Sequence, residues 1–429
     1  MTSQARYCLI GAGAAGLAAL RTLQEQGITA DCFEKSDRVG GHWHRDYDAL
    51  HLITPKKTSG FDGFPMPEEW PVYPSRDQVI EYITHYADHF NLRQNIHFNS
   101  NVDIIEPLGN LGSHGWRVIV NGKSFLYDGV LVANGHLWDC DFPIQAKYFN
   151  GISLHSGQYR NTEQLQGKVL VVGCGNSGCD LAVDAAQHGF ATDIVIRRGQ
   201  VFQPKALLGV PRAEIPFLND LPPELQNAIT QVLTLVSLGN WKNYPGMPEP
   251  ECWDLEKQPP VVNTLLMYWI QHGRINVRPS ITSISDKTVT FSDGKQSEYD
   301  SILWATGFHT RLPFLNEGLL EWRDGVPLRT AAMTLPTTLE NLYFVGLAAP
   351  RGPQWPTYCM QTRLIAHMLK LREQGLSNLS QLLATQQQPD SRIDIVRRLW
   401  LENLKETWRT LELLEKFGSS PKHASALTA

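Results

Sequence analysis

One stretch near the start of the chain decides its fold, and it reads Tyr7-Cys8-Leu9-Ile10-Gly11-Ala12-Gly13-Ala14-Ala15-Gly16. Four residues typical of a buried strand precede the glycines, and an Ala- and Leu-rich segment over 17–26 predicts a helix after them. A second strand over 28–33 then ends at Glu34, about twenty residues past the glycines. This order of strand, glycine turn, helix, strand and acidic residue predicts a site that binds a dinucleotide.

Each glycine in this turn has its own physical reason. Gly11 permits a tight turn, Gly13 lets the backbone approach a pyrophosphate, and Gly16 lets the helix pack close to the strand. The free N–H groups at the helix start favour a phosphate, and the carboxylate of Glu34 suits a ribose 2′-OH. The alternative interpretation is a tight strand–helix turn without a ligand. The residues expected to contact this first cofactor are Gly11, Gly13, Ala14, Ala15, Gly16 and Glu34.

A glycine pair follows Glu34 in the segment Arg38-Val39-Gly40-Gly41-His42-Trp43. Two glycines and an aromatic residue directly after the ribose-binding strand indicate a backbone that wraps a long flat ligand. The alternative is a glycine-rich surface turn in which Trp43 belongs to the core. We expect four further cofactor contacts from this part of the chain: Lys35, Gly41, His42 and Trp43.

The middle of the chain repeats the motif with a different ending. A strand over 168–172 precedes Gly173-Cys174-Gly175-Asn176-Ser177-Gly178, and a helix over 179–188 and a strand over 193–196 follow. Here Arg197 and Arg198 stand where the first copy has Glu34. Arginines at this place favour the 2′-phosphate of NADP, whereas an acidic residue favours a free 2′-OH. The two endings predict FAD at the first site and NADPH at the second, unless the arginines only form a solvated strand end.

Within this second site, we expect Asn176 near the NADP pyrophosphate or nicotinamide. The other contacts expected there are Gly173, Gly175, Ser177, Gly178, Arg197 and Arg198.

Two further strands end in small residues that let the chain pass close to a cofactor. One strand over 299–304 runs into Ala305-Thr306-Gly307, and its counterpart over 127–132 runs into Ala133-Asn134-Gly135. We therefore predict an α/β fold with two Rossmann-like dinucleotide-binding domains, one inserted in the other. The expected boundaries are 1–164 for the first part of the FAD domain, 165–302 for the NADPH domain, and 303–429 for the second part of the FAD domain.

Composition excludes several classes of protein. The 429 residues carry 38 Lys+Arg against 43 Asp+Glu, a net charge of -5, which argues against a nucleic-acid partner. No apolar run is long enough for a membrane span, and seven cysteines without a Cys-x-x-Cys pair do not form a disulfide framework. No metal-ligand cluster is evident. We expect a soluble, cytoplasmic protein without a bound metal.

The linker over 149–160 reads Phe149-Asn150-Gly151-Ile152-Ser153-Leu154-His155-Ser156-Gly157-Gln158-Tyr159-Arg160. It resembles the fingerprint F-x-G-x-x-x-H-x-x-x-Y-[KR] of the class B flavin-containing monooxygenases, bacterial members included. The related Baeyer–Villiger monooxygenases carry Trp where this chain has Tyr159, so the resemblance favours the N- and S-oxygenating group. It extends over about residues 7–370 and implies a hinge or cofactor-contact role for His155. It also places three more residues at the cofactors: Val102, Gln354 and Thr357.

One stretch departs from the animal members of this family. They carry an active-site Asn after a Thr, whereas this chain reads Thr54-Pro55-Lys56, and proline has no N–H or side-chain donor. This pattern is more similar to the plant YUCCA-type branch and to bacterial relatives. Thr54 and Lys56 are the candidates for catalytic groups beside the flavin, and Thr54 also for a cofactor contact.

The resemblance implies a reaction with O2 and a small organic substrate. NADPH would reduce FAD, the reduced flavin would capture O2 as a C4a-(hydro)peroxyflavin, and one oxygen atom would pass to a soft nucleophilic N or S. The YUCCA-type alternative is oxidative decarboxylation of a 2-oxo acid. The sequence is also compatible with an NADPH-dependent flavin reductase or oxidase that oxygenates no substrate, and with a binding module that has lost turnover.

An amphipathic helix is predicted over 391–417, where apolar residues recur at helical spacing among many charges. We expect this helix to pack in the core or in a homodimer rather than on a membrane.

Overall fold

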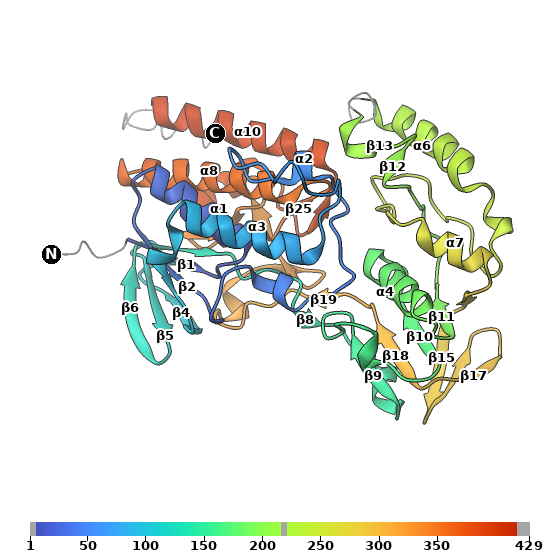
Figure 1. The fold of residues 1–429 in the computed structure, drawn as a ribbon. Coiled ribbons are helices and arrows are strands. Elements are labelled where there is room, and N and C mark those ends of the chain that lie inside the picture. Colours follow the sequence, from blue (N-terminus) through green and yellow to red (C-terminus); the bar gives the residue numbers. More distant parts are fainter. Residues whose placement is uncertain (1–5, 216–220, 418–429) are drawn as a thin grey trace.

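Two parallel sheets form the frame of the protein in the computed structural model, which describes residues 6–215 and 221–417. Figure 1 shows the two bodies side by side, one with blue, orange and red elements and the other green and yellow. The first sheet has the strand order β24-β7-β1-β2-β3. Its strands are β1 (Tyr7–Ile10), β2 (Ala30–Phe33), β3 (Ile96–His97), β7 (Gly129–Val132) and β24 (Leu342–Phe344).

The second sheet has the strand order β14-β11-β10-β18-β9. All its neighbouring strands are parallel, as in the first sheet. Its strands are β9 (Ile152–His155), β10 (Val169–Val172), β11 (Thr192–Val195), β14 (Ile275–Arg278) and β18 (Ser301–Trp304). Every one of these strands lies in sequence between β7 and β24 of the first sheet. The predicted α/β fold with one Rossmann-like unit inserted in another is therefore confirmed.

Sheet membership bears on the domain boundaries. The strand β9 precedes the expected boundary at 164/165, yet it pairs with β18 in the second sheet. A boundary at 302/303 would divide β18, which also pairs with β10 over its whole length. We propose that the inserted second domain runs from β9 to the end of β18, because hydrogen-bonded strands share one core.

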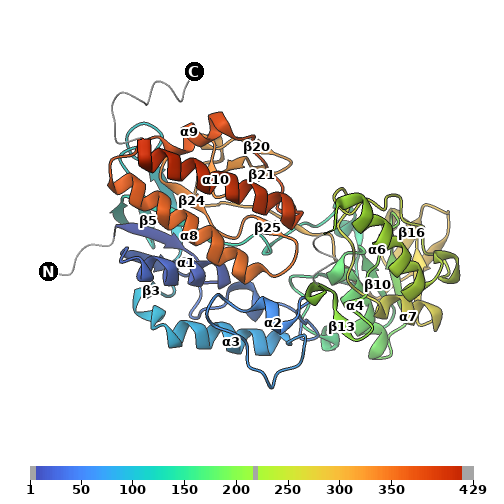
Figure 2. The same cartoon turned by 90° about the horizontal axis from the view of Figure 1, so that it is seen from above.

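The helices pack on both sheets. In the first domain, α1 (Ala14–Glu25) lies against the long helix α8 (Gln354–Glu373), with α3 (Arg76–His89) and α10 (Arg397–Phe417) beside them (Figures 1 and 2). In the second domain, α4 (Asn176–Gln187) packs on β10 and β11. Among the described residues, the other helices are α2 (Lys56–Ser59), α6 (Pro223–Leu238), α7 (Leu265–Gln271) and α9 (Leu379–Gln386).

Smaller sheets complete the two domains. Two of them have three antiparallel strands: β4 (Val102–Pro107), β5 (Trp116–Val120) and β6 (Lys123–Tyr127); and β15 (Ile281–Ser285), β16 (Thr288–Phe291) and β17 (Gln296–Glu298). The two-stranded ones are β8 (Asp139–Cys140) with β19 (Phe308–His309), β12 (Ala206–Leu207) with β13 (Val210–Pro211), β20 (Trp322–Arg323) with β21 (Val326–Pro327), β22 (Arg329–Thr330) with β23 (Leu335–Pro336), and β25 (Ala349–Pro350) with β26 (Asp394–Ile395).

Helix starts differ from the expected ones by three to six residues. The helices expected from 17 and 179 begin at Ala14 and Asn176, inside the glycine turns, because a glycine acts as the N-cap of each. The helix expected over 391–417 begins at Arg397, since the short strand β26 precedes it. Four of its apolar side chains are buried in the first domain: Trp400, Leu404, Leu411 and Leu414. Within the described ranges, no helix is both long enough and apolar enough to cross a membrane.

The crossing of β1 and α1 leaves no room for a side chain. A Cβ atom placed on Gly16 would lie 1.9 Å from the carbonyl oxygen of Gly11, far inside van der Waals contact. The second domain has the same arrangement, where a Cβ on Gly178 would lie 2.1 Å from the Gly173 oxygen. The glycines at these positions let each helix start directly above the end of its strand.

Gly16→Ala tests this close approach. The added methyl group must push α1 away from β1, so we expect the free energy of unfolding to fall by about 3 kcal/mol and FAD retention to drop. Gly13→Ala is the matched control for unfolding of the FAD-free protein, because its Cβ would meet the Gly41 Cα at an ordinary 3.7 Å. Urea denaturation of both variants measures the effect, and equal stabilities would contradict the steric argument.

Candidate functional site

The carboxylate of Glu34 lies directly under the first glycine turn. Glu34 is buried at the end of β2, where its Oε2 accepts a hydrogen bond of 2.7 Å from the backbone N–H of Ala12. Its Oε1 accepts from the N–H and the hydroxyl of Ser36, at 2.9 and 2.8 Å. The residue is thus held beside the turn as the sequence predicted for a ribose-binding acid. Its contact with a ribose stays a prediction.

The segment after Glu34 folds over that turn. Gly40 donates to the carbonyl of Ala12 at 3.1 Å, and Gly41 begins a 3₁₀ turn, Gly41–His44, with φ of 63°. The His42 Nδ1 lies 2.6 Å from an Asp46 carboxylate oxygen. Its ring stacks on the indole of Trp43. The backbone therefore returns to the glycine turn, the arrangement expected for a segment that wraps a cofactor.

The second glycine turn stands at the start of α4. The side-chain oxygen of Asn176 accepts a hydrogen bond of 2.8 Å from the backbone N–H of Val262, so this side chain anchors the 260–264 segment to the turn. Gly175 has nothing within 4 Å of its Cβ position. The backbone at Gly175 is therefore open to a close ligand, in keeping with the predicted pyrophosphate contact.

Arg197 and Arg198 follow β11, one and two residues beyond Ile196, the residue that the strand register aligns with Glu34. Both side chains are exposed, and within the described part of the chain neither has an ion-pair or hydrogen-bond partner. Two free guanidinium groups at this strand end match the needs of a 2′-phosphate. The geometry is thus compatible with the predicted NADPH site.

Two segments that were expected to pass close to a cofactor, 133–135 and 305–307, follow directly after β7 and β18, and we call them the crossing segments. Ala133 and Ala305 repeat one arrangement, because their carbonyl oxygens lie 2.7 and 2.3 Å from the Cβ positions of Gly11 and Gly173. The pairing of β8 with β19 joins the outgoing and returning chain between the domains (Figure 1). The other residues expected to contact a cofactor here form hydrogen bonds with the protein backbone. The Asn134 amide donates to the Arg311 carbonyl, and the Thr306 hydroxyl donates to the Asp141 carbonyl. The Gly135 carbonyl accepts from the Trp138 indole, and Gly307 has a positive φ of 97°.

His155 is fully buried between these segments. Its ring packs edge-on against Phe142 and Phe308, with centroids 5.3 and 4.9 Å away. Its Nδ1 accepts from the N–H of Gly157 at 3.1 Å, and burial lowers the pKa of the imidazole. A neutral histidine that packs against both crossing segments fits the expected hinge role.

The end of the linker connects the two domains. The hydroxyl of Tyr159 donates to the Asp184 carboxylate on α4 at 2.6 Å. The next residue, Arg160, donates to the carbonyls of His44 and Asp46 in the first domain, at 2.8 and 2.6 Å. The fingerprint segment thus holds α4 on one side and the cofactor-wrapping segment on the other.

The two catalytic candidates make structural contacts. The Thr54 hydroxyl lies 2.8 Å from the Ser59 hydroxyl. The Lys56 ammonium donates to the backbone carbonyls of Pro67, Glu68 and Trp70, so it fastens the 67–70 loop. Pro55 between them is the N-cap of α2 and offers no side-chain donor.

The remaining cofactor candidates lie in the first domain. Gln354 begins α8, and its Oε1 is buried without a hydrogen-bond partner in the described structure. Thr357 is fully buried one turn further, and it accepts from Arg397 at 3.1 Å. Val102 is buried at the start of β4. Lys35 lies over the Trp138 ring, and burial lowers its pKa.

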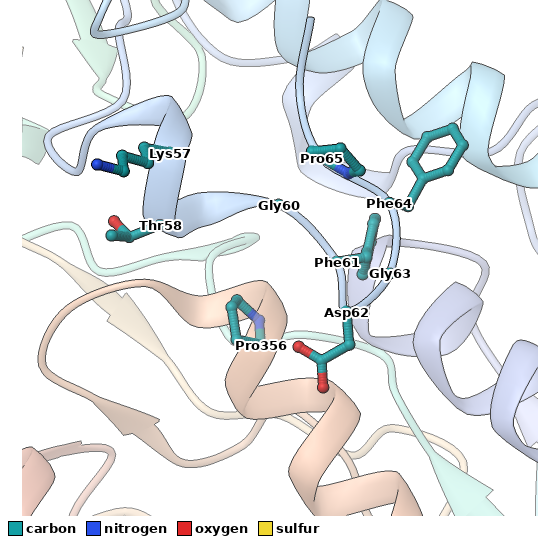
Figure 3. Close-up of a pocket in the computed structure, with 9 residues that line it drawn as sticks. All are labelled: Lys57, Thr58, Gly60, Phe61, Asp62, Gly63, Phe64, Pro65 and Pro356. Atoms are coloured by element: carbon teal, nitrogen blue, oxygen red, sulfur yellow. The ribbon is translucent and has the colours of Figure 1, made fainter.

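A pocket of about 290 Å³ opens beside α2. Figure 3 shows that Lys57 and Thr58 line one side of it, the turn over 60–65 another, and Pro356 at the start of α8 the third. The Asp62 carboxylate pairs with Arg363 of α8 at 2.7 Å. This pocket therefore joins the Pro55 region to the first turn of α8.

Comparison with known proteins identifies the family. The model of the flavin-binding monooxygenase-like family matches residues 4–402. The chain belongs to this family. It is 32% identical to the indole-3-pyruvate monooxygenase YUCCA1 of Oryza sativa, over 74% of this chain and 80% of that protein. It is 31% identical to the flavin-containing monooxygenase 1 of Sus scrofa, over 85% of this chain and 74% of that protein.

Solved structures show the same fold. A flavin-containing monooxygenase from Stenotrophomonas maltophilia superposes with a TM-score of 0.63 at 19% identity, covering 86% of this chain and 98% of that one. An open structure of cyclohexanone monooxygenase has a TM-score of 0.71 at 19% identity, covering 96% and 98%. The family membership makes this chain a flavin-dependent monooxygenase that uses FAD and NADPH, a small-molecule substrate and O2. The two glycine turns, with Glu34 at one and the arginine pair at the other, fit these cofactors.

Sequence reasoning missed a buried polar network between the domains. The Tyr47 hydroxyl donates to Asp180 on α4 at 3.0 Å, and the Asn263 amide donates to the other carboxylate oxygen at 2.8 Å. Burial raises the pKa of Asp180. Asp180 stands in the second glycine motif, but no local signal indicates that residues far along the chain would contact it.

The arginine pair yields a test of cofactor choice. Arg197→Ala or Arg198→Ala removes a partner of the 2′-phosphate, so we expect the KM for NADPH to rise at least about tenfold and the KM for NADH to stay nearly constant. Arg274→Ala is the control, since Arg274 is an exposed arginine of the same domain. Steady-state oxidation of both nucleotides measures the ratio. A parallel change for NADPH and NADH would refute the assignment.

Asp180 yields a test of the network. Because the folded protein holds the proton of Asp180 more tightly than the unfolded chain does, the ionised carboxylate costs stability as pH rises through its folded pKa. We expect Asp180→Asn to gain stability relative to the native protein as the pH rises above about 4, the ordinary pKa of an aspartate. Asp324→Asn, at an exposed carboxylate, is expected to show no such trend. Urea denaturation across this range provides the measurement.

Proposed function

We propose that this protein transfers one atom of O2 to a nucleophilic nitrogen or sulfur of a small organic substrate, with NADPH as the reductant. The observation that carries the proposal is the pair of glycine turns with unlike endings in two domains joined by the fingerprint linker. The flavin supplies the oxygen chemistry when it is bound. The chain itself supplies binding, orientation and protection from water.

Buried aromatic rings favour a site that excludes water. Trp355 in the first turn of α8 stacks on Phe61 and Tyr82, with ring centroids 5.4 and 5.2 Å apart. Trp43 from the cofactor-wrapping segment meets the same indole edge-on at 6.4 Å. These rings lie between the cofactor-wrapping segment and the pocket beside Pro356. A dry environment of this kind protects reactive oxygen species from water and strengthens nearby electrostatic interactions.

Oxidative decarboxylation of a 2-oxo acid is the second candidate, and Pro55 favours it. Pro55 stands where the animal relatives carry an Asn, and its carbonyl is used by Thr58 and Ser59 of α2. No side-chain amide is therefore available there. The relative from Oryza sativa is an indole-3-pyruvate monooxygenase. In this reaction, one atom of O2 enters the acyl group as CO2 leaves, NADPH supplies two electrons, and the other oxygen atom is released as water.

One set of measurements separates the candidates. The purified protein with FAD and NADPH is given methyl p-tolyl sulfide or phenylpyruvate, with catalase present to remove free H2O2. We expect a sulfoxide that carries one atom from ¹⁸O2. Phenylacetate and CO2 in place of the sulfoxide would establish the second candidate. Release of H2O2 equal to the NADPH consumed, measured without catalase, would mean that the protein is an oxidase that oxygenates neither substrate.

Gly178→Ala is the control for this experiment. Its Cβ would collide with the Gly173 carbonyl, which should abolish NADPH use while the first domain retains FAD. Sulfoxide formed equally by this variant would show that the product arises without the second domain.

A further inference from the structure

The hairpin β12–β13 of the second domain reaches across to the first domain. Figure 2 shows β13 beside α2, the helix that follows Pro55. The Tyr73 hydroxyl donates to the carbonyl of Lys205 at 2.9 Å. Glu214, just after the hairpin, lies 4.0 Å from the ammonium of Lys57 on α2. Side chains at the base of this hairpin are therefore placed where the two domains meet.

Two cations stand opposite each other at that base. The β12–β13 register pairs Ala206 with Pro211, and the N–H of Arg212 donates to the Lys205 carbonyl at 3.0 Å. Lys205 and Arg212 directly flank the paired residues, and this backbone hydrogen bond makes them neighbours at the base of the hairpin.

The guanidinium of Arg212 has no acceptor for one of its buried groups. Its Nη1 is inaccessible to solvent and unpaired in the described structure, and burial lowers the pKa of Arg212. Gln203, two residues before Lys205, is only 4% exposed, and its amide Nε2 is unpaired as well. Buried donors without acceptors cost free energy, which a ligand with negatively charged oxygens would recover.

The nearby carboxylates are already engaged. Glu214 faces Lys57. Asp180 accepts from Tyr47 and Asn263, and its pKa, raised mainly by burial, is lowered in part by Lys205. The charge of His51 also lowers the pKa of Asp180. Within residues 6–215 and 221–417, the guanidinium of Arg212 therefore has no counter-ion of its own.

The surrounding backbone places these donors near the NADPH turn. The N–H of Gln203 donates to the carbonyl of Val261 at 2.8 Å, and the next residue, Val262, donates to Asn176 at the start of α4. The donors thus stand between the second glycine turn and the Pro55 helix. Arg197 and Arg198, which we expect to bind the 2′-phosphate of NADP, lie elsewhere, after the end of β11.

We propose that Arg212, with Lys205 and Gln203, binds the carboxylate of the organic substrate at the junction of the two domains. A guanidinium fork matches the two oxygens of a carboxylate, and a lysine and an amide complete the set of donors. This inference rests on the proposed function and predicts that small organic acids bind more tightly than uncharged substrates. A phosphate of the dinucleotide is the other anion with this chemistry, and the test separates the two.

Equilibrium binding to the FAD- and NADP-loaded protein tests the site without turnover. The probes are 3-phenylpropanoate and its uncharged analogue 3-phenylpropanamide, measured by isothermal titration calorimetry. We expect the acid to bind at least about tenfold more tightly than the amide, since hydrogen bonds to charged groups are the stronger ones. Arg212→Gln should remove this preference, and Lys205→Gln should reduce it. Arg274→Gln, at an exposed arginine, should leave it intact.

Thermal melting distinguishes a binding residue from a structural one. Arg212→Gln removes an uncompensated buried charge, so its melting temperature should equal or exceed that of the native protein. Equal affinity for acid and amide in the native protein would overturn the proposal. So would a raised KM for NADPH in Arg212→Gln with acid binding unchanged, because the anion would then be a nucleotide phosphate. A failure to form sulfoxide or to release CO2 concerns the proposed function alone, since the binding measurement needs no turnover.

Discussion

The structure depends on two places where a helix starts directly above the end of a strand with no side chain between them. At Gly16 and Gly178, an added Cβ would lie within about 2 Å of a backbone oxygen. The same close approach turns the first N–H groups of α1 and α4 toward the carboxyl edge of each sheet, where we expect a phosphate of each cofactor to bind. One steric constraint thus sets both the packing of each domain and the position of each cofactor site.

Polar contacts relate the two domains in the region of the linker, where Tyr47, Ala49 and Leu50 of the first domain also pack on the hydrophobic core of the second. Arg160 binds backbone carbonyls of the first domain, while its neighbour Tyr159 binds α4 of the second. Tyr47 reaches Asp180 in a buried network of the same kind. Hydrogen bonds depend strongly on distance and direction, so contacts of this type define one relative orientation of the domains. For an enzyme that moves electrons from one dinucleotide to another, that orientation matters as much as either site.

In this protein, a buried donor without a hydrogen-bond partner is a better indicator of a ligand site than a charged residue that stands out in the sequence. Lys56 stands at the position where the sequence suggested a catalytic group, yet its ammonium is already bound by three backbone carbonyls. No sequence pattern singles out Arg212, but its buried Nη1 has no hydrogen-bond acceptor in the described structure. A group that has its partners is explained by the fold, whereas a buried donor without one points to a ligand.

The sequence by itself determined both dinucleotide turns, the unlike endings at Glu34 and Arg197–Arg198, the α/β class and the family. These features are local, because glycine spacing, strand patterns and the residue at a strand end act within about thirty residues. The tertiary structure alone decided that β9 and β18 belong to the second sheet, that Asp180 meets Tyr47, and that Arg212 stands opposite Lys205. These depend on which distant segments lie side by side, and side-chain partners far along the chain leave no periodic signal in the sequence.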